Sequence, residues 1–184
     1  MKQKDRSGSV THKQTNSRPN FQTWLIRTKP EWTWNAAHQK AICRALTDAW
    51  GTSKRLMVFM PPRHGKSEMV TVRYAAWRLE QRPSMRILIC CHTQRLANLF
   101  SRKIRRIVSE RVKLGRERSA VNEWETPEGG GVTAIGVGGG LAGIGADLVI
   151  VDDPIRNRSD AESQYIRQSA AMCIRGSNPG RCQF

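Results

Sequence analysis

Three consecutive residues, Gly65, Lys66 and Ser67, could hold a phosphate group. They follow a short apolar run at 55–60 and precede a stretch whose apolar residues recur at helical spacing. Backbone N–H groups at the start of a helix point toward a bound anion, a lysine reaches the outer phosphates, and a serine hydroxyl can ligate Mg²⁺. The usual motif begins with a glycine five residues before Gly65, where this chain has methionine, so these residues alone are a weak signal.

A second motif places two carboxylates at the end of an apolar run. Residues 147–151 (DLVIV) lead into Asp152 and Asp153, and a proline follows. Ligands of open α/β sheets bind at the carboxyl ends of the strands. Asp152 can hold Mg²⁺ through water there, while Asp153 can orient or deprotonate an attacking water. An acidic turn would explain the pair by itself, but together with the phosphate loop it predicts an ATPase core.

A scaffold of alternating strands and helices is predicted to position these motifs. Continuous apolar runs bounded by turn residues indicate strands buried on both faces, and a spacing of three to four residues indicates helices. We expect strands at 55–60, 86–91, 121–124, 132–137 and 147–151, and helices at 36–50, 66–80, 94–114 and 157–171. The pattern predicts an α/β fold with a mostly parallel sheet.

The remaining segments show no such periodicity. Residues 1–20 are polar and basic and are interpreted as a disordered arm, and residues 172–184 as an irregular tail. The domain is therefore expected to span 21–171. The glycine-rich stretch 138–145 is interpreted as backbone that packs close to a ligand or changes shape with nucleotide state, with a plain linker as the alternative.

The net charge of +16 and the isoelectric point near 10.7 favour a polyanionic partner over a merely basic soluble surface. The predicted helix 94–114 is strongly basic: from Arg95 to Arg118 the chain has nine basic residues and only two acidic ones. Four of its cations are expected to share the solvent side and to contact a DNA backbone: Arg102, Arg105, Arg106 and Lys113. A solvated helix face is the alternative.

The five cysteines form neither a metal-ligand pattern nor an even disulfide framework, so Cys90 and Cys91 are expected to be small core residues in a reducing cytoplasm. The polar start of the chain argues against a signal peptide, and no apolar run reaches the ~20 residues that a membrane span needs. His38 and Gln39, near the start of a predicted helix, could read a purine base or could be ordinary surface residues.

The stretch from Leu56 to Glu68 resembles the phosphate loop of the large terminase subunit of tailed bacteriophages and prophages. That family replaces the first loop glycine and carries an arginine in the loop, as this chain does at Arg63. Further matches follow in the same order along residues 20–170: CHTQRLA at 91–97, AIGVGG at 134–139, AGIGAD at 142–147 and VIVDDP at 149–154.

The resemblance implies a three-layer P-loop NTPase fold and an ATP-driven motor that packages double-stranded viral DNA into a preformed capsid. Such a motor works in the host cytoplasm as a homo-oligomeric ring at the portal protein, together with a small terminase subunit that selects the DNA. ATP and Mg²⁺ are the implied cofactors.

The family's roles can be carried over to matching positions. Lys66 would bind the β- and γ-phosphates, Ser67 and Asp152 would hold Mg²⁺, and Arg63 would act as an arginine finger supplied in cis. Asp153 occupies the place of a catalytic glutamate, with a shorter side chain. The nucleotide-binding set would then be Pro62, Arg63, His64, Gly65, Lys66, Ser67 and, for adenine, Gln39.

Two departures from the family pattern accompany the resemblance. The chain carries no second carboxylate cluster for DNA cleavage, so no nuclease activity is expected. The strand that should lie between the Asp152 strand and the phosphate-loop strand is also missing, which would leave an empty slot in the sheet. We interpret the chain as a truncated prophage-type copy, frameshifted near Met172. A helicase-like ATPase and an inactive basic DNA-binding remnant are the alternatives.

Overall fold

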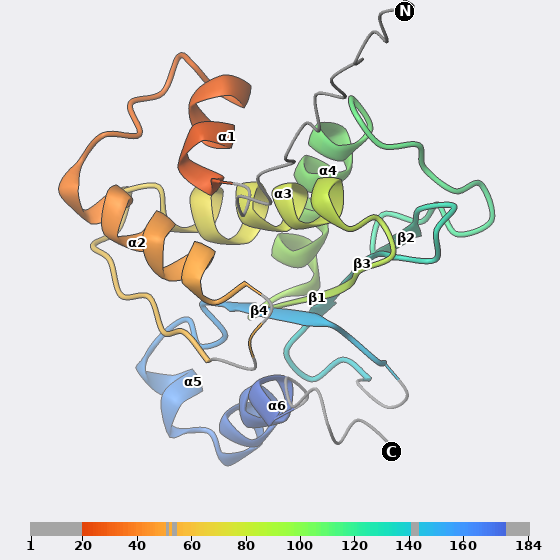
Figure 1. Ribbon diagram of the computed structural model, residues 1–184. Coiled ribbons are helices and arrows are strands. Elements are labelled where there is room, and N and C mark those ends of the chain that lie inside the picture. Colours follow the sequence, from red (N-terminus) through yellow and green to blue (C-terminus); the bar gives the residue numbers. More distant parts are fainter. Residues whose placement is uncertain (1–19, 51, 53–54, 141–143, 176–184) are drawn as a thin grey trace, which may run out of the picture.

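The computed structural model describes residues 20–50, 52, 55–140 and 144–175, which form helices around a four-stranded sheet (Figure 1). The strand order is β2-β3-β1-β4, with β1 at Arg86–Cys91, β2 at Glu123–Glu125, β3 at Gly131–Gly136 and β4 at Leu148–Asp152. β1 is parallel to both β3 and β4, whereas β2 is antiparallel to β3. The parallel strands end together, so Asp152 lies at the carboxyl edge. The predicted α/β class with a mostly parallel sheet is confirmed.

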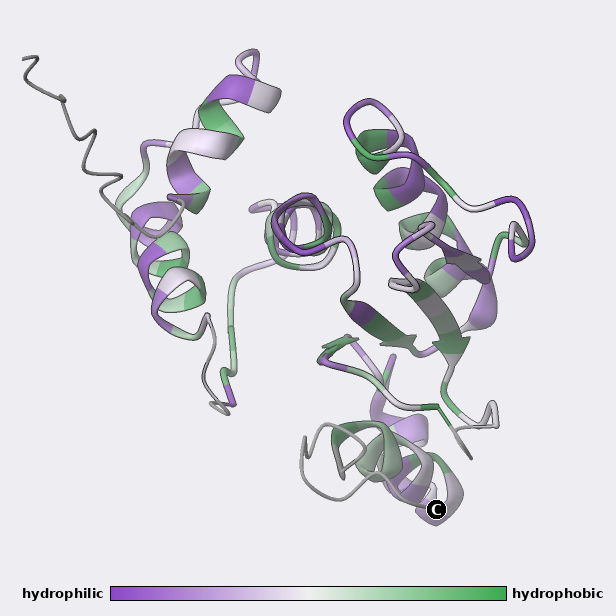
Figure 2. Cartoon of the chain, turned by 45° about the vertical axis from the view of Figure 1, so that its right-hand side comes forward, coloured by the Kyte–Doolittle hydropathy of each residue, from purple (hydrophilic) through white to green (hydrophobic). Residues whose placement is uncertain are grey.

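Helices cover both faces of this sheet. On one face, α4 (Gln94–Val108) packs on β1 and β3, and η1 (Ser67–Arg73) contacts β4; on the other face, α6 (Gln164–Arg175) contacts β4. The side chains of β1 alternate accordingly between the main core and a second, smaller cluster of apolar residues. Figure 2 shows β1 and β3 as mostly hydrophobic ribbons, as expected for strands that are buried on both faces.

The helix after the phosphate loop begins as a π-helix. η1 continues into α3 (Tyr74–Gln81), so the predicted helix at 66–80 forms, although its first turns are wider than an α-helix. π-helical turns are rare and frequently occur at functional sites. Beyond α3 lie α1 (Phe21–Thr28), which was not predicted, and α2 (Ala37–Asp48), which corresponds to the predicted helix at 36–50.

The predicted strand at 55–60 is wrong. This segment is a coil that leads from α2 to η1 (Figure 1). Val58 and Met60 are half-buried in it, but Met57 is 78% and Phe59 84% exposed. A strand needs a neighbour that pairs with its N–H and C=O groups. Within the described residues the sheet ends at β4, and no strand lies between β4 and this segment. The coil is thus a run with strand-like composition but without a partner.

Helix boundaries in the second half of the chain also differ from the prediction. α4 ends at Val108 rather than at 114, because Ser109 caps it and the chain then turns. The single helix expected at 157–171 is two, α5 (Arg158–Glu162) and α6, separated by Ser163. α6 reaches Arg175, so its last turn enters the stretch predicted to be irregular. The basic arm at 1–19 and the tail from 176 onward lie outside the described residues.

The cysteine prediction is partly wrong. Cys90 and Cys91 are buried, as expected, but Cys90 on β1 forms a disulfide with Cys173 on α6, with 6.5 Å between their Cα atoms. The pairing escaped prediction because it joins residues 83 positions apart. Cys43 and Cys91 are free thiols.

None of the helices in the described part of the chain is long and apolar enough to cross a membrane.

Candidate functional site

The phosphate loop and the carboxylate pair meet at the carboxyl edge of the sheet. Lys66 is followed at once by η1. Asp152 is the last residue of β4 and Asp153 comes directly after the strand, 86 and 87 residues further along the chain than Lys66. The Lys66 Nζ atom lies 3.3 Å from Asp152 Oδ1 and donates a hydrogen bond to Asp153 Oδ1. Tertiary structure therefore places the lysine of the first motif between the carboxylates of the second.

The three charged residues of this site differ in their exposure to solvent. Asp152 is 4% exposed, Lys66 24% and Asp153 61%, so one carboxylate is buried and the other faces solvent. Burial alone would lower the pKa of Lys66, but the hydrogen bond to Asp153 and the charges of both carboxylates outweigh it and raise this pKa. The lysine is thus a cation at neutral pH.

Cys91 ends β1 and lies beside Asp152 in the register of β1 and β4. Burial, with the added repulsion of Asp152 and Asp153, raises the pKa of its thiol to about 12. Because a thiolate is the nucleophilic form, Cys91 remains protonated and inert at neutral pH. The chemistry of this site therefore belongs to the carboxylates and the lysine.

A buried threonine fixes the orientation of Asp152. The Thr71 Oγ1 hydroxyl donates a 2.9 Å hydrogen bond to Asp152 Oδ2, and Thr71 is 1% exposed. One oxygen of the carboxylate is therefore held by η1, and the other faces Lys66. Sequence reasoning missed Thr71, since its only signal is a threonine four residues after Ser67.

The loop backbone is left-handed at two positions. Arg63 has φ +65° and Gly65 has φ +81°, and at the facing strand end Asp153 has φ +44°. Residues other than glycine seldom adopt this region, and such positions cluster at ligand sites. The His64 Nδ1 atom lies 2.8 Å from the carbonyl oxygen of Pro62, which closes the loop. Within the described residues the exposed Arg63 guanidinium has no hydrogen-bond or ion-pair partner.

The oxygen donors at this edge suit Mg²⁺. A serine hydroxyl and one or two carboxylates, completed by water and substrate phosphates, are the ligands that Mg²⁺ usually takes in nucleotide sites. Ser67, Asp152 and Asp153 supply these groups, and Thr71 leaves one Asp152 oxygen turned toward Lys66. The described residues contain no group of three or more His, Cys, Asp or Glu side chains that could hold a metal by themselves.

The predicted adenine-reading pair lies at the start of α2, beside the loop. The Gln39 Oε1 atom accepts a 3.2 Å hydrogen bond from the Ala36 N–H, so this oxygen caps the helix. The ring of His38 contacts that of His64 edge to face, with 6.1 Å between the centroids. Gln39 therefore has a structural task in addition to any ligand contact.

Two side chains just after β1, those of His92 and Gln94, contact backbone atoms at the end of β4 and on β3. His92 Nδ1 lies 3.2 Å from the carbonyl oxygen of Asp153. Gln94 donates to the Ala134 carbonyl at 2.7 Å and accepts from the Gly136 N–H at 2.9 Å. The Gln94 amide therefore bonds to β3. This contact argues against the helicase-like alternative, in which the residues after β1 would contact nucleic acid.

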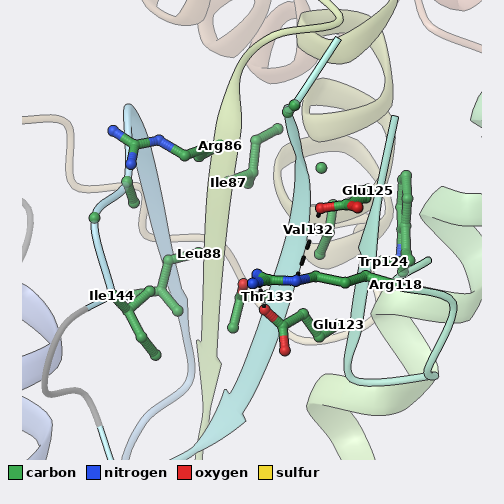
Figure 3. A pocket seen from close by; sticks show the side chains of 15 residues that line it. Arg86, Ile87, Leu88, Arg118, Glu123, Trp124, Glu125, Val132, Thr133 and Ile144 are labelled. Carbon is green, nitrogen blue, oxygen red and sulfur yellow. Dashed lines mark hydrogen bonds and ion pairs between the residues drawn. The ribbon is translucent and has the colours of Figure 1, made fainter. Parts of the chain in front are cut away.

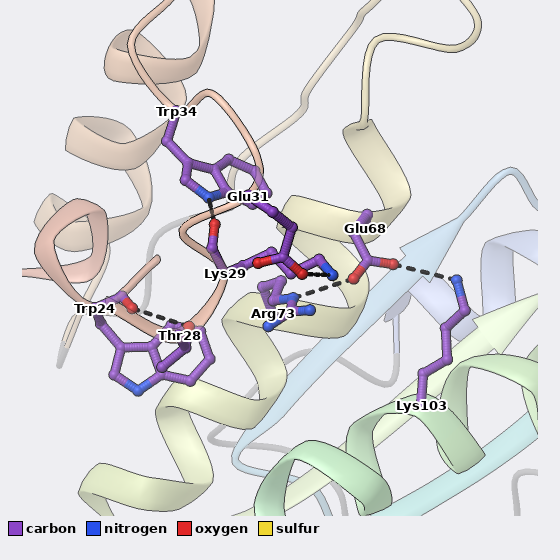
Figure 4. A network of polar contacts seen from close by, with 8 residues as sticks. All are labelled: Trp24, Thr28, Lys29, Glu31, Trp34, Glu68, Arg73 and Lys103. Carbon is purple, nitrogen blue, oxygen red and sulfur yellow. Dashed lines mark hydrogen bonds and ion pairs between the residues drawn. The ribbon is translucent and has the colours of Figure 1, made fainter. Parts of the chain in front are cut away.

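Glu68 connects the phosphate loop to α4 (Figure 4). Its carboxylate accepts from Arg73 Nε at 3.0 Å and from Lys103 Nζ at 3.2 Å. Glu68 and Arg73 are five residues apart, a separation that faces the same way on a π-helix but not on an α-helix. Reasoning from α-helical spacing could not have found this pair.

The four predicted DNA-contact residues do not all lie on α4. Arg102 and Arg106 are exposed one turn apart on α4, whereas Arg105 donates a 2.7 Å hydrogen bond to the carbonyl of Ser119. Lys113 lies beyond the end of α4, so the expectation that it continues the helix face is wrong. Arg102 and Arg106 therefore form the surviving cationic pair, which we call the α4 arginine pair.

A cavity of about 200 Å³ opens near the amino ends of β1 and β3 (Figure 3). Its lining includes Arg86, Arg118, Glu123 and Glu125. Arg118 pairs with Glu123 at 2.9 Å and approaches Glu125 at 3.8 Å, so the charges neutralise one another. This cavity contains none of the predicted site residues and lies at the opposite end of β1 from Lys66.

A comparison with known protein families matches most of the chain. A family model described as "Terminase large subunit, T4likevirus-type, N-terminal" matches residues 57–177, which is well over half of the chain. The match includes the phosphate loop, η1, the whole sheet and α6. A search of curated proteins found no match.

Proposed function

The chain belongs to the T4-like-virus type of large terminase subunits, matching their N-terminal part, and from that premise we propose that it is the ATP-hydrolysing unit of a DNA-packaging motor. The observation that carries the proposal is the meeting of Lys66 with Asp152 and Asp153. A cation on a loop before a helix, opposite a carboxylate at a strand end, is the arrangement that P-loop NTPases use for phosphoryl transfer from a nucleotide.

The cation and the hydroxyl of the loop have distinct tasks in this proposal. Lys66 exchanges its two carboxylate partners for the β- and γ-phosphates of ATP, and backbone N–H groups of the loop orient the phosphates. Ser67 and Asp152 would hold Mg²⁺, which when bound would neutralise the charge that develops on the phosphate oxygens. Thr71 keeps Asp152 in one orientation as the contacts of Lys66 change.

The two exposed groups act on the reacting atoms. Asp153, released from Lys66 by the nucleotide, orients the attacking water and accepts its proton. Arg63 stabilises the charge on the transferring phosphoryl group. Both residues have left-handed backbone conformations that hold them at the edge of the site.

The proposed fold is a three-layer P-loop NTPase domain over 21–171. In that fold the run at 55–60 becomes a strand once a neighbouring strand pairs with it and with β4. Support comes from its composition and from its exposed Met57 and Phe59, which a sheet would bury.

Double-stranded DNA is the proposed substrate of translocation, and it contacts the α4 arginine pair. The Glu68–Lys103 ion pair links the loop to the helix that carries these arginines. By membership in the family, the chain is further proposed to work as a homo-oligomeric ring with a portal protein and a small terminase subunit in the host cytoplasm.

A test is DNA-stimulated ATP hydrolysis by the purified chain at several salt concentrations. The double variant Arg102→Gln/Arg106→Gln is expected to bind DNA with a salt slope lower by about 2, since each lost phosphate contact removes about 1 from the slope. DNA stimulation should fall in parallel, while hydrolysis without DNA is unchanged. The same assays are run on a chain extended by a strand-forming segment that can pair with β4.

The matched control is Arg27→Gln/Arg44→Gln, which removes the same charge from exposed positions on α1 and α2. It should leave the salt slope and the stimulation near their original values. If both double variants lose DNA binding and stimulation to the same extent, only the net charge matters, and the α4 arginine pair is not the DNA-binding surface. Salt-sensitive DNA binding without turnover, in the chain and in the extended chain, would instead favour the inactive DNA-binding remnant.

A further inference from the structure

An aromatic side chain lies exposed beside the phosphate loop. Trp32 is 43% exposed, whereas Trp24, Trp34, Trp77 and Trp124 are at most 4% exposed. The Cζ3 atom of the Trp32 ring lies 4.0 Å from the position that a Cβ would take on the loop glycine before Lys66. A large ring is therefore open to solvent next to the proposed phosphate site.

The ring of Trp32 is held in place by the neighbouring ring of Trp34. It stacks on Trp34, with 5.5 Å between the ring centroids and 27° between the planes. Trp34 is itself fixed, since it is 2% exposed, its Nε1–H donates to the Lys29 carbonyl at 3.0 Å, and its own carbonyl accepts from Gln22 at 3.2 Å. The ammonium group of Lys29 lies 5.8 Å from the centroid of the Trp32 ring. The exposed ring is thus oriented before any ligand binds.

We propose that Trp32 is the stacking surface for the base of the nucleotide whose phosphates the loop holds. The inference rests on the proposed function, because it places the base relative to Lys66. Every nucleobase has a π-face, and a flat indole binds it without hydrogen-bond readout. A fixed ring also binds without a large loss of side-chain freedom.

This assignment separates affinity from base recognition. The Gln39 carbonyl caps the backbone at Ala36, which leaves only its amide hydrogens for an adenine. Stacking on Trp32 then supplies most of the affinity for the base. The site is therefore expected to bind ATP and GTP within a few-fold of each other.

The experiment compares ATP with inorganic tripolyphosphate, each with Mg²⁺, by calorimetric titration of the full chain. Trp32→Ala is expected to raise the Kd for ATP about tenfold or more, and to leave the Kd for tripolyphosphate unchanged. Trp32→Phe should restore most of the ATP affinity, because phenylalanine keeps a π-face. A thermal melt of each variant checks that the fold is retained.

The outcomes distinguish this inference from the proposed function. If Trp32→Ala weakens ATP and tripolyphosphate equally, the tryptophan only supports the loop and the stacking assignment is wrong. An unchanged ATP affinity in Trp32→Ala would overturn it as well, with the phosphate site intact. If the unaltered chain binds neither ligand, the proposed function fails and this inference fails with it.

Discussion

Lys66→Ala is expected to raise the Kd for Mg·ATP by about 100-fold or more and to reduce hydrolysis to background. Lys66 is the cation that faces both carboxylates of the site, and it is only 24% exposed. A phosphate that replaces those carboxylates would lose its charge-assisted hydrogen bond and would then face Asp152 and Asp153 without compensation. Equilibrium titration and a phosphate-release assay measure the two effects.

The control for this variant is Lys40→Ala, which removes an exposed lysine from α2. It should bind and hydrolyse ATP like the unaltered chain. A melting curve must accompany Lys66→Ala, because the buried Asp152 loses its counter-charge and the fold loses stability with it. Normal ATP binding by a folded Lys66→Ala variant would show that this loop does not hold the phosphates.

Trp77→Ala is expected to lower the free energy of unfolding by about 3–5 kcal/mol. Trp77 is 1% exposed on α3, and its ring contacts three others, at centroid distances of 5.0 Å to Phe21, 4.8 Å to Trp50 and 5.6 Å to Tyr74. Truncation leaves a cavity where α1, α2 and α3 meet. Urea denaturation followed by fluorescence or circular dichroism measures the loss.

The matched substitution Trp32→Ala provides the comparison, because it removes the same side chain from a position that is 43% exposed. It should cost about 1 kcal/mol or less. If the two variants unfold at the same urea concentration, Trp77 does not hold α1 against α3.

Local sequence patterns were sufficient to predict many of the helices and strands. The apolar runs predicted β1, β3 and β4, and helical spacing predicted α2, the helix after the loop and most of α4. The run at 55–60 is as apolar as those strands but forms none. Its state depends on whether a neighbour pairs with it, and composition carries no information about that neighbour.

Only the chemical groups of the candidate site were predictable from the sequence, and their tertiary contacts were not. Gly65-Lys66-Ser67 and Asp152-Asp153 were recognisable because residue type and spacing both matched a chemistry. Thr71 and Trp32 were not, since their importance comes from tertiary contacts with Asp152 and with the loop. The Glu68–Arg73 pair was hidden by the π-helix, whose spacing differs from that of an α-helix.

A double-mutant cycle on Lys66 and Asp152 tests most directly the claim that both residues serve one Mg·ATP site. The Kd for ATP with Mg²⁺ is measured for the unaltered chain, Lys66→Ala, Asp152→Asn and the double variant. Groups that share one ligand are not independent, so the double variant should lose less binding free energy than the sum of the single losses, by about 1 kcal/mol or more. Additive losses, or an unaltered chain that binds no ATP, would contradict the account.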